Sequence, residues 1–533
     1  MRKKTFLKGA AILGVAGLMV QVMGAIFRIP LANIIGDEGM GYYQTAYPIY
    51  IFLLVFSTNG APAAISKMVS ERIAVGKHAE AHTVFRISFL VMLILGVVSS
   101  AIVFFGAKPI VTMLGNPHAY YAMAAIAPAL LFVPIMAVFR GYFQGMQEMA
   151  PTAFSQLVEQ AIRVGIGLIL AVLLVEKGIE YAAGGACFGT SIGPIAGTLI
   201  LIIVYLRKSN KIKMEMDAEN AVIKESSKSI FKRLVYLTVP ITIGVSILPI
   251  MNIADVGIVM NRMQSIGFSY ETSNALYGQL TGMAGPIINI PQALALSIAL
   301  SMVPAVAAAQ STKDKSFLKD NVSLGFRTAM ILGVPCAFGL MSLSEPIMLL
   351  LYPMQAESAA SAAPSLFYLS IGIVFLAIAQ TMAGILQGLD KASAAVYSLL
   401  AGLVVKIILT YLLTGIPQLN VQGAAIGSSV AYGVVGILNL LAVKRACETE
   451  FDWKLTVIKP VLCGILMSVC VLISYSLLIG ILGNTLATAL SICVGAGVYG
   501  ISLIFSKSIL PNEIKALPKG EMLYRLLHKI HLV

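Results

Sequence analysis

The stretch VFRISFLVMLILGVVSSAIVFF, residues 84–105, carries one charged side chain in 22 positions. A helix needs about 20 apolar residues to cross the hydrocarbon core of a bilayer, so this stretch predicts a membrane span. The apolar residues form a continuous run and do not alternate with polar ones over about ten positions. That pattern favours a helix over a strand of a membrane barrel. The fold therefore depends on how many such runs the chain contains.

The composition extends this interpretation to the whole chain. It has 533 residues, of which 58% are hydrophobic and 11% are charged, whereas soluble proteins carry about 25% charged residues. This balance excludes a soluble enzyme, a disordered scaffold and a small secreted disulfide protein. The net charge of +13 does not indicate nucleic acid, because basic residues of membrane proteins gather at the inner surface. The six cysteines form no CxxC pair and predict no metal site.

The apolar runs predict an all-α polytopic membrane protein with fourteen transmembrane helices. The predicted spans are 6–28, 42–65, 84–105, 120–143, 153–175, 181–206, 232–260, 274–306, 323–345, 364–388, 393–414, 422–443, 457–480 and 485–506. With the N-terminus inside, 31 of the 37 Lys and Arg residues lie in inner segments or at the inner ends of spans, three lie in outer loops and three lie elsewhere within spans. Such a bias predicts that both termini are cytoplasmic.

The two halves of the sequence resemble each other. The segment RGYFQG at 140–145 aligns with AGILQG at 383–388, and at the same offset Arg163 aligns with Lys406. Six spans in each half and a shared inner-side start predict two pseudo-symmetric six-helix bundles related by an axis along the membrane normal. The predicted parts are a bundle at 1–206, a cytoplasmic linker at 207–231, a bundle at 232–445, helices 13 and 14 at 446–506, and an amphipathic cytoplasmic tail at 507–533.

Three basic residues lie within predicted spans: Arg28, Arg163 and Lys406. Ionisable groups are costly in a membrane, so they are expected to face a cavity or a partner. Glu159 precedes Arg163 by four residues, which allows an ion pair on one helix face; a purely structural pair is the alternative to a binding role. Lys406 has no such acidic neighbour. One cation on each half suits a dianionic or diphosphate ligand.

Span seven carries a second polar group. Asn252 and Asp255 are three residues apart, and Asp255 could hold a proton or Na⁺, or balance a cation. Arg262 opens the following outer loop and is expected to guard the outer mouth of the site. No ATP-binding P-loop occurs. We therefore expect no cofactor, no metal and no enzymatic activity, and we expect energy from the membrane potential or from a coupling ion, H⁺ or Na⁺.

Several motifs resemble a known family. The run PTAFSQLVEQAIRV at 151–164, together with 140–145 and GAPAAISK at 60–67, resembles polysaccharide-biosynthesis exporters of the stage V sporulation protein B/YtgP branch. These are relatives of MurJ lipid II flippases within the multidrug/oligosaccharidyl-lipid/polysaccharide superfamily. The resemblance implies a MATE/MurJ-like fold with a V-shaped cavity and two extra helices beside a lateral groove. It also implies that Arg28, Glu159 and Arg163 match functional positions, although MurJ's second-span arginine has no counterpart between Tyr42 and Ser66.

Together these features predict a flippase of a bacterial cytoplasmic membrane. Its expected substrate is an undecaprenyl-diphosphate-linked precursor of peptidoglycan, lipid II or a similar glycolipid, moved from the inner to the outer leaflet by alternating access. Membrane lipids and cell-wall synthesis proteins are the other expected partners. Three alternatives stay open: an exporter of another polyprenyl-linked polysaccharide unit, a cation-coupled multidrug antiporter of the same fold, and a membrane enzyme acting on the same lipids.

Overall fold

The computed structural model describes residues 2–58, 60–217, 226–311 and 315–508. Nearly all of these residues are helical, and these ranges contain no β-strand. Eleven helical stretches among them are long and apolar enough to cross a membrane. The predicted all-α polytopic fold is confirmed, and each predicted span lies on helix over nearly its whole length. The tail helix expected near the C-terminus falls outside the described residues.

The first long helix, α1 (Arg2–Thr58), reverses direction at Gly36, whose φ of 67° and ψ of −172° are not helical. Nineteen residues of straight helix would separate Arg28 from Tyr47 by about 28 Å. The Arg28 guanidinium carbon instead lies 5.2 Å from the centre of the Tyr47 ring. The two arms of α1 therefore pack against each other, and they correspond to the first two predicted spans. Helix α15 (Lys459–Phe505) reverses in the same way at Gly483, where φ is 68°.

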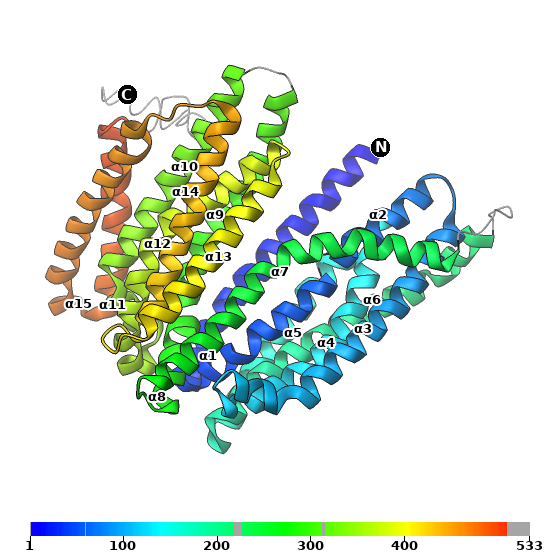
Figure 1. Ribbon diagram of the computed structural model, residues 1–533, viewed down its shortest axis with the longest axis horizontal. Coiled ribbons are helices and arrows are strands. Elements are labelled where there is room, and N and C mark those ends of the chain that lie inside the picture. The colour runs from blue at the N-terminus through cyan, green and yellow to red at the C-terminus, as the bar shows by residue number, and fades with distance from the viewer. Residues whose placement is uncertain (1, 59, 218–225, 312–314, 509–533) are drawn as a thin grey trace. The chain divides into compact units, whose positions relative to one another are not determined.

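Contacts divide the chain into two compact units, Met1–Gly282 and Met283–Val533. After α1, the first unit contains α2 (Gly60–Ala74), α3 (His78–Met113), η1 (Pro117–Ala119), α4 (Tyr120–Gly145), α5 (Ala150–Leu174), η2 (Val175–Lys177), α6 (Ile179–Asp217), α7 (Ser227–Ser265) and α8 (Tyr270–Gly278). Helices α3, α4 and α6 lie side by side, and α5 packs on α6 and α1 (Figure 1). Helix α7, assigned by sequence to the second bundle, packs on α1, α2 and α3. The six-plus-six division remains a prediction.

The second unit begins within the π-helical turn η3 (Gln279–Ala284). Its further elements are α9 (Gly285–Ser311), α10 (Lys315–Ser342), α11 (Ser344–Leu351), η4 (Pro353–Gln355), α12 (Ala356–Gly388), α13 (Ala392–Thr414), α14 (Gln422–Cys447), η5 (Lys454–Ile458) and α15. Helix α12 packs against α9, α10 and α14, and α13 packs against α14. Helix α15 packs against α10 and α11 and supplies the last two predicted spans.

The internal repeat is visible in how the helices pack. A Cβ atom added at Gly141 or Gly145 of α4 would come within 3.0 or 2.7 Å of atoms of α2. A Cβ atom added at Gly384 or Gly388 of α12 would come within 2.4 or 2.8 Å of backbone oxygens of α9. Only glycine permits such close approach. The motif that repeats in the sequence thus makes the same helix contact in both halves.

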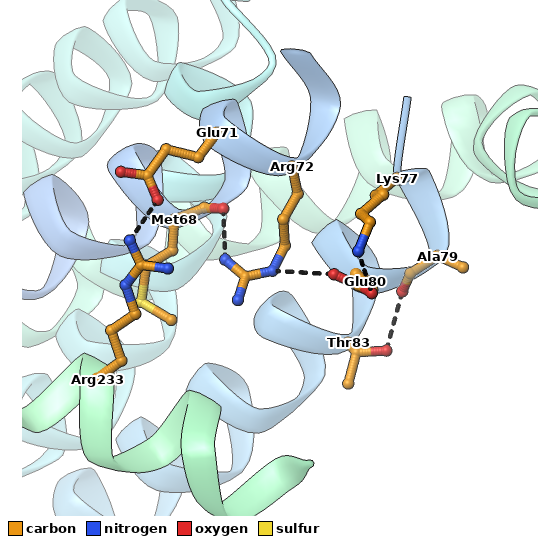
Figure 2. A network of polar contacts seen from close by, with 8 residues as sticks. All are labelled: Met68, Glu71, Arg72, Lys77, Ala79, Glu80, Thr83 and Arg233. Atoms are coloured by element: carbon orange, nitrogen blue, oxygen red, sulfur yellow. Dashed lines mark hydrogen bonds and ion pairs between the residues drawn. The ribbon is translucent and has the colours of Figure 1, made fainter. Parts of the chain in front are cut away.

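A network of charged side chains fixes the ends of α2, α3 and α7 (Figure 2). Arg72, only 5% exposed, donates to the Met68 carbonyl at 2.8 Å and lies 3.8 Å from the Glu80 carboxylate. Glu71 accepts a hydrogen bond from Arg233 at 2.6 Å, which joins α2 to the start of α7. These contacts hold α7 to the first unit at one end.

A buried polar cluster fixes the other end of this unit, next to the reversal of α1. Asn116 is fully buried; its amide donates to Thr45 at 2.7 Å and to Asn274 at 2.8 Å, and its carbonyl accepts from the Tyr270 hydroxyl. Asn274 in turn donates to a backbone oxygen of α1 at 2.9 Å. Because buried polar groups are costly when unpaired, this cluster locks η1 and α8 onto α1.

Candidate functional site

Two arginines in the first unit converge on one aromatic ring. The guanidinium carbon of Arg28, on the first arm of α1, lies 5.2 Å from the centre of the Tyr47 ring. The guanidinium carbon of Arg163, on α5, lies 5.3 Å from the same centre. Both distances lie within the roughly 6 Å range of cation–π attraction. Two of the three in-span cations predicted from sequence are therefore neighbours.

The tyrosine that receives these cations is held by other aromatic rings. Tyr43 stacks on Tyr47 with ring centroids 5.5 Å apart and an interplanar angle of 18°. The ring centroid of Tyr50 lies 6.0 Å from that of Tyr47. Tyr43 and Tyr50 are 1% and 2% exposed. Spacings of three and four residues place the three rings on one face of the second arm of α1. The position of Tyr47 is thus fixed by buried neighbours.

The ion pair between Glu159 and Arg163 that the spacing allows is replaced by one between Glu159 and Arg140. The Glu159 carboxylate accepts a hydrogen bond from the Arg140 guanidinium of α4 at 2.7 Å, and a second Arg140 nitrogen donates to Ser155 at 3.0 Å. The side chains of Arg140 and Glu159 are only 12% and 18% exposed. Spacing of four residues places two side chains on one helix face, but a neighbouring helix can offer a better aligned partner.

The pairing of Glu159 with Arg140 leaves Arg28 and Arg163 at the Tyr47 ring, here called the arginine cluster, positively charged. Among the residues that the structure describes, no carboxylate forms an ion pair with Arg28 or Arg163. The two guanidinium carbons are at most about 10 Å apart, so the charges repel by at least about 1.6 kcal/mol at an effective dielectric constant of about 20. Each cation–π contact returns roughly 0.5–2 kcal/mol. The ring therefore offsets the repulsion without neutralising the charge, and an anion placed at the two guanidinium groups would be attracted by both.

The third predicted cation lies in the second unit. Lys406 is 7% exposed and shares one face of α13 with Ser398, Gly402, Thr410 and Thr414. This face packs on α14, since a Cβ atom at Gly402 would come within 2.3 Å of a valine side chain there. Lys406 is thus inside its helix bundle. Its predicted place opposite Arg163 across a two-fold axis remains a prediction.

The polar residues predicted on span seven lie on α7. Asp255 is half-buried and Asn252 is exposed. Arg262 is half-buried near the end of α7 and donates to the Ser265 hydroxyl at 3.4 Å. The described contacts do not join these residues to the cluster at Tyr47. Their roles in ion coupling and at the outer mouth remain predictions.

Sequence reasoning missed Tyr47 and Arg140. A tyrosine in an apolar span gives no charge signal, and its partners come from elements far apart in sequence. The internal repeat could have identified Arg140 as the partner of Glu159. At the offset of 243 residues, Arg140 aligns with Ala383 and Glu159 aligns with Gly402, so both members of the ion pair are absent together from the second half.

Comparison with known proteins places the fold in a family. A family model described as "Polysaccharide biosynthesis protein" matches residues 6–310, and a MatE model matches residues 281–412. This chain belongs to the polysaccharide biosynthesis protein family. The resemblance predicted from the sequence motifs is thereby confirmed.

The similar proteins include a lipid II flippase and a multidrug transporter. Stage V sporulation protein B of Bacillus subtilis is 27% identical, with 97% of this chain and 98% of that protein covered. Lipid II flippase MurJ of the same organism is 27% identical, with 87% and 86% covered. Among solved structures, an inward closed MurJ has a TM-score of 0.68 at 18% identity, covering 93% and 99%. An inward-facing multidrug resistance MATE transporter of the MOP superfamily also has a TM-score of 0.68, at 14% identity, covering 80% and 94%.

These comparisons confirm the predicted class of protein. The relatives and structural neighbours whose names state an activity are flippases and transporters, and this family member is a flippase-type membrane transporter and not an enzyme. The substrate is a finer question, which the chemistry of the arginine cluster addresses.

Proposed function

We propose that this protein moves a polyprenyl-diphosphate-linked glycan, lipid II or a similar cell-wall precursor, from the inner to the outer leaflet of a bacterial cytoplasmic membrane. The observation that carries the proposal is the pair Arg28 and Arg163, both within 5.3 Å of the Tyr47 ring centre and without an ion-pair partner among the described residues. Guanidinium groups bind phosphate oxygens through paired, charge-assisted hydrogen bonds.

Moving a diphosphate across a membrane requires cationic groups such as these two guanidinium groups. A diphosphate cannot enter hydrocarbon unaided, because burying unpaired charge is very costly. Two guanidinium groups replace part of its hydration during the crossing, and Lys406 is proposed as a further substrate-binding residue. The relative named as a lipid II flippase carries out such a movement on lipid II. We extend that substrate class to this chain as part of the proposal.

The polyprenyl tail needs an apolar path, and the second unit offers a suitable pocket. A pocket of about 500 Å³ lies between α9, α10, α11 and α15. Its walls are almost wholly apolar, with Ile290, Leu343, Leu351, Met467 and Ile492 among the lining residues. An isoprenoid chain would bury apolar surface there. We propose the tail as its occupant.

The energy source proposed for the cycle is the membrane potential, with Asp255 as a site for a coupling H⁺ or Na⁺. The potential contributes about 2.3 kcal/mol for each charge moved across 100 mV. With both termini cytoplasmic, this potential would draw an empty cationic site back toward the inner face. Arg262 is proposed to contact the substrate as it leaves.

The MATE-like fold also raises the possibility of multidrug export, and the cluster chemistry argues against it. A transporter of organic cations needs an accessible carboxylate. Glu159, the acidic residue in this part of α5, is occupied by Arg140 at 2.7 Å. The charged groups at Tyr47 are the cations Arg28 and Arg163, which would repel such a drug.

The test is a leaflet-resolved assay of lipid II in cells depleted of this protein and supplied with variants. Arg28→Gln and Arg163→Gln should leave the precursor at the inner leaflet at normal membrane abundance of the protein. Arg207→Gln, the same change at an exposed position on α6, should restore export. Normal export by both cluster variants would refute the proposal. Loss of both variants from the membrane would show that the arginines serve the fold.

A further inference from the structure

The Tyr47 ring contacts two cations that form no ion pair with a carboxylate within the described part of the chain. Its distances to the guanidinium carbons, 5.2 and 5.3 Å, are nearly equal. Because both carbons lie within 5.3 Å of one ring centre, they cannot be farther apart than twice that distance. Tyr47, on the second arm of α1, thus limits the distance between Arg28 on the first arm and Arg163 on α5.

The neighbours of Tyr47 make this a rigid support. Tyr43 stacks on it at 5.5 Å and itself meets Phe27, the residue before Arg28, at 6.4 Å in an edge-to-face contact. Tyr50 lies 6.0 Å from Tyr47. Phe27, Tyr43 and Tyr50 are each at most 3% exposed. Through Tyr43 and Phe27, the position of the Tyr47 ring therefore depends on the position of Arg28 on the first arm.

An aromatic ring positions a cation differently from a carboxylate. A carboxylate would fix the guanidinium groups and also cancel their charge and occupy their N–H donors. A ring attracts the cation through its face and leaves the edge of the guanidinium plane, with its N–H groups, open to a ligand. Glu159 would be the carboxylate for that role, but Arg140 holds it. The site keeps two charges within a limited spacing of each other.

We propose that Tyr47 is a positioning residue that sets the spacing of Arg28 and Arg163, so that both engage the linked phosphates of a diphosphate lipid at once. A lipid monophosphate with the same tail would satisfy only one of them. Tyr47 is then the residue that makes the transporter select diphosphate over monophosphate. This inference deepens the proposed function and rests on it.

The experiment measures binding of undecaprenyl diphosphate and undecaprenyl monophosphate to the purified full-length protein in nanodiscs. The wild type should prefer the diphosphate by about tenfold, as expected for one additional charge-assisted contact. Tyr47→Phe keeps the ring and should keep the preference. Tyr47→Leu removes the ring and should lose most of the preference, through weaker diphosphate binding and nearly unchanged monophosphate binding.

A second series separates positioning from a general role in folding. Phenylalanine analogues with one to five ring fluorines at position 47 keep the shape of the ring and progressively weaken its attraction for cations. The diphosphate preference should fall stepwise along this series while the thermal unfolding midpoint stays constant. If Tyr47→Leu fails to fold, the fluorine series alone tests whether Tyr47 positions the two arginines.

The outcomes distinguish the two proposals. A wild-type protein that shows no preference for the diphosphate lipid would overturn the proposed function, and the role of Tyr47 with it. A wild-type preference that survives in the leucine variant, or does not change along the fluorine series, would overturn only the role of Tyr47. Equal weakening of both lipids in every variant would show that Tyr47 supports the fold and does not select the ligand.

Discussion

The ion pair between Arg140 and Glu159 predicts the effect of a substitution outside the arginine cluster. If Arg140 is changed to Gln, the Glu159 carboxylate loses the guanidinium that lies 2.7 Å away. The next cation within reach is Arg163, one helical turn further along α5. We expect Glu159 to turn toward Arg163, to cancel its charge and to draw it away from Tyr47. Arg140→Gln should therefore weaken substrate binding although Arg140 itself binds no substrate in the proposed mechanism.

The size of the effect follows from the geometry. Side chains four residues apart on a helix are about 6 Å from each other. At an effective dielectric constant of about 20, a carboxylate and a guanidinium at that distance attract by about 3 kcal/mol. A diphosphate would have to displace this attraction, so its affinity should fall by about 100-fold. The side chains are 12% and 18% exposed, so solvent screens them little.

The assay is a double-mutant cycle on the affinity for undecaprenyl diphosphate and on the thermal unfolding midpoint. Arg140→Gln should reduce both quantities: the affinity because Glu159 now competes for Arg163, and the unfolding midpoint because the largely buried ion pair between α4 and α5 is lost. The double variant Arg140→Gln/Glu159→Gln should bind within about threefold of the wild type, because no carboxylate remains to compete. Wild-type affinity in the single variant, or equally weak binding in the double variant, would refute the reasoning.

Three further predictions concern topology and stability. A cysteine at Gly483 should react with an impermeant thiol reagent on intact cells, whereas one at 208–217 should react only after the membrane is opened; labelling of the latter in intact cells would contradict the orientation. Asn116→Leu, which removes three buried hydrogen bonds, should destabilise the protein by about 2–4 kcal/mol, measured as a lower unfolding midpoint. Reversing the pair as Glu71→Arg/Arg233→Glu should retain transport that either single change reduces, and a double variant worse than both would show that the pair does not act as a unit.

Much of the fold could be predicted from local sequence. Length and continuity of the apolar runs predicted the helices, since backbone polar groups in lipid must be paired within a helix. The recurrence of Gly141 and Gly145 as Gly384 and Gly388 predicted the repeat, and the structure explains the recurrence by the close approach of α4 to α2 and of α12 to α9. These features depend on residues close together in the chain or on sterically required glycines.

The site could be predicted only in part. Arg28 and Arg163 were found because a charge in an apolar span is conspicuous. Tyr47 gave no such signal, since a tyrosine in a membrane helix is common and its significance depends on which residues from other segments surround it. The partner of Glu159 was mistaken for the same reason: helical spacing reports residues on one helix and carries no information about α4.

The corrected pairing changes the charge balance of the site. With Glu159 matched to Arg140, the charge at the Tyr47 ring is that of Arg28 and Arg163. The empty arginine cluster therefore carries more positive charge than the sequence alone indicated. An inside-negative potential would act on this charge and favour return of the empty site to the inner face. A bound diphosphate would cancel most of it, so the loaded transporter would meet little electrical opposition on its way outward. Neutralising Arg140 and freeing Glu159 would remove this asymmetry, which links the charge pairing in α4 and α5 to the direction of transport.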